Sequence, residues 1–135
     1  DKDGEISFFV DPKNPGALTM STKKERISGN KISVSCLSLS SLIKDRHIQY
    51  IDYIKMDIEG SEQEALEDLN ENDHLKNIDK FCIEYHHRIC GHKSCLSKFL
   101  EIFEKNGFEY QIDTHCIPTN AEHKFQDVLL YLYRS

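Results

Sequence analysis

The sequence of 135 residues lacks the features that mark several common protein classes. No apolar run approaches the roughly 18 residues that a membrane-spanning helix needs, and we expect no secretory signal peptide. A basic excess is also missing, because 17 lysines and arginines stand against 23 aspartates and glutamates, for a net charge of −6. That balance argues against non-specific binding to nucleic acid or to an anionic membrane surface. We therefore predict no nucleic-acid partner and no membrane partner.

Cysteines are few, odd in number and irregularly spaced. The five cysteines are Cys36, Cys82, Cys90, Cys95 and Cys116. An odd count at irregular spacing is a poor basis for a disulfide framework. Free thiols are typical of the reducing cytosol, so we predict a cytoplasmic protein.

The chain of 135 residues is long enough for one domain. Strands and helices are predicted to alternate along it. The predicted strands are Ile6–Val10, Ile32–Cys36, Ile51–Ile58, Phe81–Tyr85, Phe108–Ile112 and Val128–Tyr133. Helical spacing of apolar residues predicts helices over about 39–45, 61–69 and 94–106, the first with Ser38 as N-cap. The alternation, followed by two closing strands, indicates an α/β fold with right-handed parallel crossovers.

The central strand, Ile51–Ile58, carries bulky residues on both faces. A strand of this kind is typical of a parallel sheet that helices cover on both sides. Glu59 and Gly60 end it, and Ser61 to Glu64 then show the capping-box pattern that opens a helix.

Acidic residues stand at the ends of two predicted strands, Asp57 and Glu59 after the first and Glu84 in the next. Ligands of open parallel sheets bind outside the carboxyl ends of the strands, and neighbouring strands lie about 5 Å apart. Asp57 and Glu84 can therefore face one crevice, where they would suit a cationic ligand or a metal, or supply a general base. Acids at strand ends also favour the N-terminus of a following helix, so a purely structural role stays open.

A resemblance to a known family rests on the segment 54–62, IKMDIEGSE, followed by Ala65-Leu66. It resembles the K-[IM]-D-[IV]-E-G-x-E signature of the FkbM family of S-adenosylmethionine-dependent methyltransferases. The segments 3–8, 83–86 and 107–108 resemble further anchors of that family in the same order.

The fold that this resemblance implies is α/β, a Rossmann-like methyltransferase sheet of order 3-2-1-4-5-7-6. Segment 51–58 would be strand 4, segment 81–85 strand 5, and the last two strands the C-terminal antiparallel pair. The family's glycine-rich cofactor loop and the acid that holds the ribose are absent from these 135 residues. We therefore expect residues 1–135 to be the C-terminal part of a single class I methyltransferase domain, incomplete at its N-terminal side. An exposed edge of strand 4 then favours self-association.

The activity that the resemblance implies is O-methylation of a small-molecule or sugar hydroxyl with S-adenosyl-L-methionine as cofactor. By resemblance Asp57 and Glu59 bind the cofactor, and Asp57, Glu84 and His86 are the candidate catalytic residues. A histidine is the natural base near neutral pH, although His86 can equally be structural. We assign no metal ligands. The chain by itself is expected to bind the cofactor weakly or not at all and to be inactive.

Two non-catalytic alternatives stay open. Segment 86–95 holds three histidines and two cysteines, and zinc favours such ligands. Its spacing matches no standard zinc finger, so the segment is either a solvated loop or part of a zinc-stabilised binding module. Segment 38–42 lacks the acids of the family's L-D-d-L motif, which would suit a degenerate methyltransferase half that serves only as an interaction module.

Overall fold

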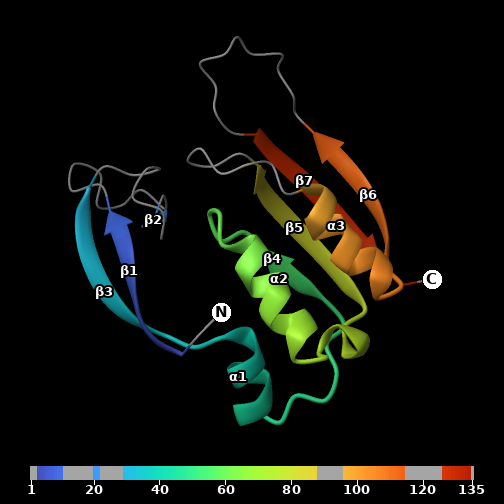
Figure 1. Cartoon of the computed structure of the whole chain (residues 1–135), viewed down its shortest axis with the longest axis horizontal. Helices are drawn as coiled ribbons and strands as arrows, with labels where there is room; N and C mark the ends of the chain where they lie inside the picture. Colours follow the sequence, from blue (N-terminus) through green and yellow to red (C-terminus); the bar gives the residue numbers. More distant parts are fainter. Residues whose placement is uncertain (1–2, 11–19, 22–28, 88–95, 115–125, 135) are drawn as a thin grey trace.

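A computed structural model of the chain describes residues 3–10, 20–21, 29–87, 96–114 and 126–134, and it has a mixed α/β architecture (Figure 1). In chain order the elements are β1 (Gly4–Val10), β2 (Met20–Ser21), β3 (Asn30–Cys36), α1 (Leu39–Asp45), β4 (Ile54–Met56), α2 (Glu62–Glu71), the 3₁₀ turn η1 (Leu75–Asn77), β5 (Lys80–His87), α3 (Leu96–Lys105), β6 (Glu109–Thr114) and β7 (Gln126–Tyr133). None of the helices in these ranges is long and apolar enough to cross a membrane.

Four strands form the main sheet in the order β4-β5-β7-β6. β4 and β5 run parallel, with Met56 opposite Ile83, whereas β7 is antiparallel to both β5 and β6. This is the order expected for strands 4, 5, 7 and 6, and the C-terminal antiparallel pair is present as predicted. In the described part of the chain, β4 has no partner strand on its outer side.

Helices α2 and α3 lie on one face of this sheet, where they enclose the hydrophobic core (Figure 1). Phe99 and Phe103 of α3 are fully buried, as their helical spacing predicts. The Phe103 ring lies edge-to-face against Phe99, Phe81 of β5 and Phe108, with centroids 5.1–5.5 Å apart. Phe81 and Phe108 meet in the same way at 5.6 Å. Such geometry adds about 0.5–1.5 kcal/mol per pair beyond the burial of area.

The expectation that helices cover both faces of the central strand is wrong for the described residues. Met56 is buried beneath the helices, but the side chain of Tyr53 is exposed on the approach to β4. The strand itself is also shorter than predicted, because only Ile54–Met56 pair continuously and Ile51 makes an isolated bridge to Ile78. Asp57 and Ile58 therefore belong to the turn that follows the strand.

The first three strands form a second, antiparallel sheet of order β2-β1-β3. The predicted strand Ile32–Cys36 is present as β3, and it pairs with β1 although helix α1 follows it. Period-two alternation indicates a half-buried strand without saying which strand it pairs with.

Polar contacts at the start of α1 connect the two sheets. Ser38 caps the helix as predicted, accepting a hydrogen bond from the Ser41 amide. Asp3, just before β1, accepts from the Ser38 amide at 2.8 Å and from the Ser41 hydroxyl at 2.7 Å. On the other side, the Ser40 amide donates to the Asp68 carboxylate of α2 at 2.8 Å. Helix α1 is thus bonded to both β1 and α2.

Candidate functional site

The turn between β4 and α2 contains acidic residues of the segment 54–62, which resembles the family signature. Glu59 has a φ of 57° and Gly60 a φ of 99°, so two successive residues adopt left-handed conformations. For a residue with a Cβ that conformation costs roughly 1–2 kcal/mol. Backbone strain of this kind persists only where the surroundings enforce it, and it clusters at functional sites.

The carboxylate that enforces this turn is Glu62, the first residue of α2. Its Oε1 accepts hydrogen bonds from the Gly60 amide at 2.9 Å and from the Ile58 amide at 3.3 Å. The predicted capping box did not form in the expected way, because the Ser61 side chain makes no cap bond. The helix N-terminus is stabilised instead by this acid in its first turn, where the helix dipole favours a negative charge.

Glu62 is only 1% exposed, which is rare for a carboxylate. Burial alone raises the pKa of this carboxyl. Hydrogen bonds from His86 and from the Gly60 amide outweigh burial, and the net effect is a pKa below the ordinary value. Glu62 is therefore an ionised carboxylate held inside the protein by its donors.

His86, near the end of β5, is oriented by Glu62. Its Nδ1 lies 2.9 Å from Glu62 Oε1, and the two side chains are both 2% exposed. Since Oε1 already accepts two backbone N–H groups, Nδ1 is the donor in this pair. The opposite ring nitrogen, Nε2, lies 3.4 Å from Glu59 Oε2.

Asp57 completes the cluster at the carboxyl end of β4. One ligand atom each of Asp57, Glu59 and His86 lies within 4.8 Å of the others. Asp57 is 37% exposed at its side chain and makes a 3.5 Å ion pair with Lys55. We call Asp57, Glu59 and His86 the carboxylate–histidine cluster; it sits where open α/β sheets bind their ligands.

Glu84, the other predicted catalytic acid, is not part of this group of close ligand atoms. It lies in β5, half-buried, two residues before His86, and pairs in register with Leu129 of β7. Among the described residues, Asp57 thus lies close to Glu59 and His86, whereas Glu84 is not among these close ligand atoms. The rest of the histidine- and cysteine-rich segment, residues 88–95, lies outside the described residues.

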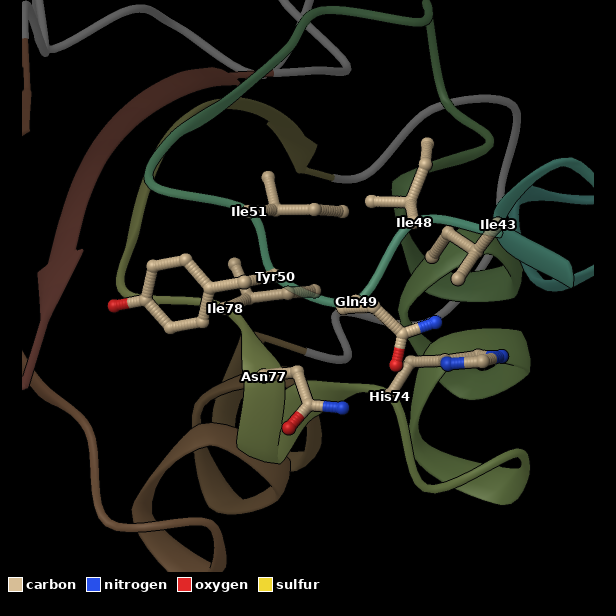
Figure 2. Close-up of a pocket in the computed structure, with 8 residues that line it drawn as sticks. All are labelled: Ile43, Ile48, Gln49, Tyr50, Ile51, His74, Asn77 and Ile78. Atoms are coloured by element: carbon tan, nitrogen blue, oxygen red, sulfur yellow. The ribbon is translucent and has the colours of Figure 1, made fainter. Parts of the chain in front are cut away.

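A small pocket lies at the opposite, amino end of the parallel strands (Figure 2). It is lined by Ile43, Ile48, Gln49, Tyr50, Ile51, His74, Asn77 and Ile78. Ile51 and Ile78 form the bridge that precedes the β4–β5 ladder, which places the pocket a strand length away from Asp57. It has room for about one water molecule, so it is too small for a cofactor.

Sequence reasoning missed the role of Glu62. An acid at the start of a helix is ordinarily a solvated charge that favours the dipole, and nothing in its spacing says that it is buried. The available signal was the third acid of the D-I-E-G-x-E segment, which follows the glycine by two residues. In the described chain, Cys36 and Cys82 are free thiols, as predicted for those two positions.

The acids and the histidine at the carboxyl ends of two parallel strands thus lie where open α/β sheets bind their ligands. The family model described as "Methyltransferase FkbM domain" matches residues 1–134. The chain therefore belongs to the FkbM methyltransferase family, which confirms the family resemblance. No curated protein and no solved structure matches it.

Proposed function

We propose that this chain contributes part of the active site of an S-adenosylmethionine-dependent O-methyltransferase, with the site at the carboxylate–histidine cluster. Family membership over residues 1–134 carries the proposal. The strand order β4-β5-β7-β6 supports it, because it is the order expected for four of the seven strands of a Rossmann-like methyltransferase sheet. The acceptor we infer is a hydroxyl of a small molecule or a sugar, in the cytoplasm.

The residues present fit part of a cofactor site. When bound, S-adenosylmethionine supplies a methyl group on a positively charged sulfonium. Asp57 and Glu59 place two carboxylates in the turn between β4 and α2, with side chains 37% and 23% exposed and so within reach of a ligand. Negative charge there complements the sulfonium, whereas no glycine-rich loop for the rest of the cofactor occurs in the 135 residues. Weak cofactor binding by this chain alone therefore stays a prediction.

Methyl transfer needs an aligned nucleophile and an acceptor for one proton. The hydroxyl oxygen forms the new bond to the methyl carbon while the carbon–sulfur bond breaks and its electron pair stays on sulfur. His86 is the candidate that takes the hydroxyl proton, at Nε2, because Glu62 holds the hydrogen on Nδ1. Glu84 is the second candidate, from its place on the same strand.

The test is methyl transfer from labelled S-adenosylmethionine to a panel of hydroxylated acceptors, by the natural protein that contains this chain. The Asp57→Asn variant keeps the size of the side chain and removes its charge, so we expect at least a tenfold loss of kcat/KM. Asp52→Asn, an exposed acid on the approach to β4, is the matched control and should keep its activity. Equal activity of both variants, or transfer to no acceptor, would contradict the proposal.

A further inference from the structure

Two hydrogen-bond acceptors face each other in the carboxylate–histidine cluster. Because Nδ1 of His86 donates to Glu62, a neutral ring presents a lone pair at Nε2. That lone pair lies 3.4 Å from the carboxylate oxygen Oε2 of Glu59. Two acceptors at this distance repel each other, and a positive charge between them relieves the repulsion. Such a charge can be a proton that Nε2 takes up or a cation that both atoms bind.

The distances suit a metal ion. Ligand atoms that each lie about 2.1 Å from one ion are about 3.0–3.5 Å apart, and the Nε2–Oε2 separation falls in this range. An oxygen of Asp57 lies within 4.8 Å of one ligand atom each of Glu59 and His86, close enough to complete a facial set after a small side-chain rotation. The local charge also favours a cation, because the carboxylates of Glu62 and Glu59 both lie against one imidazole and Asp57 lies beside them.

The surroundings of His86 are those of a metal-bound histidine. Metal-ligating histidines almost always donate their second ring N–H to a carboxylate or a carbonyl, which fixes the tautomer and the ring orientation. Glu62 makes this bond from a position that is 98% shielded from solvent at its side chain and is itself fixed by two backbone amides. The Glu62–His86 hydrogen bond does not depend on the carboxylates of Asp57 and Glu59, and it orients the ring so that Nε2 faces them.

We propose that Asp57, Glu59 and His86 bind a divalent cation, with Glu62 as the carboxylate that orients His86. One imidazole nitrogen and two carboxylates form a mixed set that suits Mn²⁺, and three ligands leave coordination positions for water or for ligand oxygens. The inference uses the same side chains as the proposed function but does not rest on methyl transfer. In the cation-bound form Nε2 is a ligand and no longer a base, and the cation instead makes a coordinated hydroxyl more acidic.

The experiment is a titration of the 135-residue chain with Mn²⁺, followed by the loss of the free-ion electron paramagnetic resonance signal. We expect saturable binding of one ion, and at least tenfold weaker binding in both Asp57→Asn and Glu59→Gln. These two side chains are partly exposed, so their variants should fold. Asp113→Asn, an exposed acid in β6, is the matched control and should bind as the unchanged chain does.

Glu62→Gln separates the orienting role from direct ligation. The amide keeps the size of the side chain, and loss of such a partner typically weakens metal affinity 10–100-fold, so we expect Mn²⁺ binding to weaken within that range. Circular dichroism on each variant checks that it is folded.

Absence of saturable Mn²⁺ binding by the unchanged chain would overturn the proposal and leave a proton as the charge between Nε2 and Glu59. Equal weakening in the Asp113→Asn control would overturn it as well. A chain that binds Mn²⁺ but belongs to an inactive protein would refute only the methyltransferase proposal.

Discussion

The two sheets of this protein are stabilised in different ways. The four-stranded sheet and its helices supply every buried apolar residue of the described chain, from Ile43 to Leu132. In β1 and β3 no described residue is buried, and Ile32 is 41% exposed. The carboxylate–histidine cluster lies on the well-packed sheet, whereas the N-terminal sheet is held by strand pairing and by polar contacts at Asp3. Local stability should follow this division, because it depends on buried apolar contacts.

The largest expected effect is that of a cavity in the aromatic core. Phe103 is fully buried against Phe81, Phe99 and Phe108, so Phe103→Ala should lower the free energy of unfolding by about 3–5 kcal/mol. Ile32→Ala in β3 should change it by less than about 1 kcal/mol. Urea denaturation followed by circular dichroism measures both. Similar losses in the two variants would show that the N-terminal sheet shares the core.

An intermediate effect is expected for Glu62→Gln, which removes the buried negative charge beside His86. The variant should be less stable by about 1–3 kcal/mol at neutral pH, since it weakens a charge-assisted hydrogen bond in the interior. Folding lowers the pKa of Glu62, so its contribution is complete above the pKa of the unfolded chain, about 4.5. That contribution is lost as the pH falls through the lower pKa of the folded state.

Chemical denaturation of the Glu62→Gln variant between about pH 2 and pH 7 gives the corresponding check. The difference in stability between the unchanged chain and the variant should shrink as the pH falls below about 4.5. Glu67→Gln, an exposed acid on the same helix, should show no such dependence. A pH-independent difference would mean that Glu62 acts through packing alone.

The smallest effect is expected for Asp3→Asn, because the asparagine oxygen still accepts one of the two hydrogen bonds. Bonds from the Ser38 amide and then the Ser41 hydroxyl lower the pKa of Asp3, so its charged form is the one that holds β1 to α1. Amide hydrogen exchange should become faster in β1 and β3 and stay unchanged in β5 and β7. Faster exchange in all four strands would mean that the two sheets unfold together.

Local patterns in the sequence were sufficient for much of the fold and for the family. The Ser38 cap, the apolar spacing of α3 and the segment 54–62 each depend on residues close together in the chain, and each was found as predicted or nearly so. The partner of β3 could not be predicted, because strand pairing depends on residues far apart in sequence. The burial of Glu62 was hidden for the same reason, since its donor His86 lies 24 residues away.

The left-handed turn at Glu59 also depends on tertiary structure. Glutamate rarely adopts a positive φ, and the hydrogen bonds from the Ile58 and Gly60 amides to Glu62 help to hold this turn. Sequence reasoning placed Asp57 and Glu59 at the end of a strand, but it paired Asp57 with Glu84. The turn instead directs the Glu59 carboxylate toward Nε2 of His86.

Orientation of the His86 ring by Glu62 is the claim on which both the proposed proton acceptor and the proposed cation site depend. Nitrogen-15 NMR of the imidazole side chains reports directly which ring nitrogen carries hydrogen, with exposed His47 as an internal reference. The account predicts that His86 Nδ1 stays protonated and hydrogen-bonded in the metal-free chain at neutral pH. A neutral His86 ring that carries its hydrogen on Nε2, or one that averages between both tautomers as an exposed ring does, would contradict it.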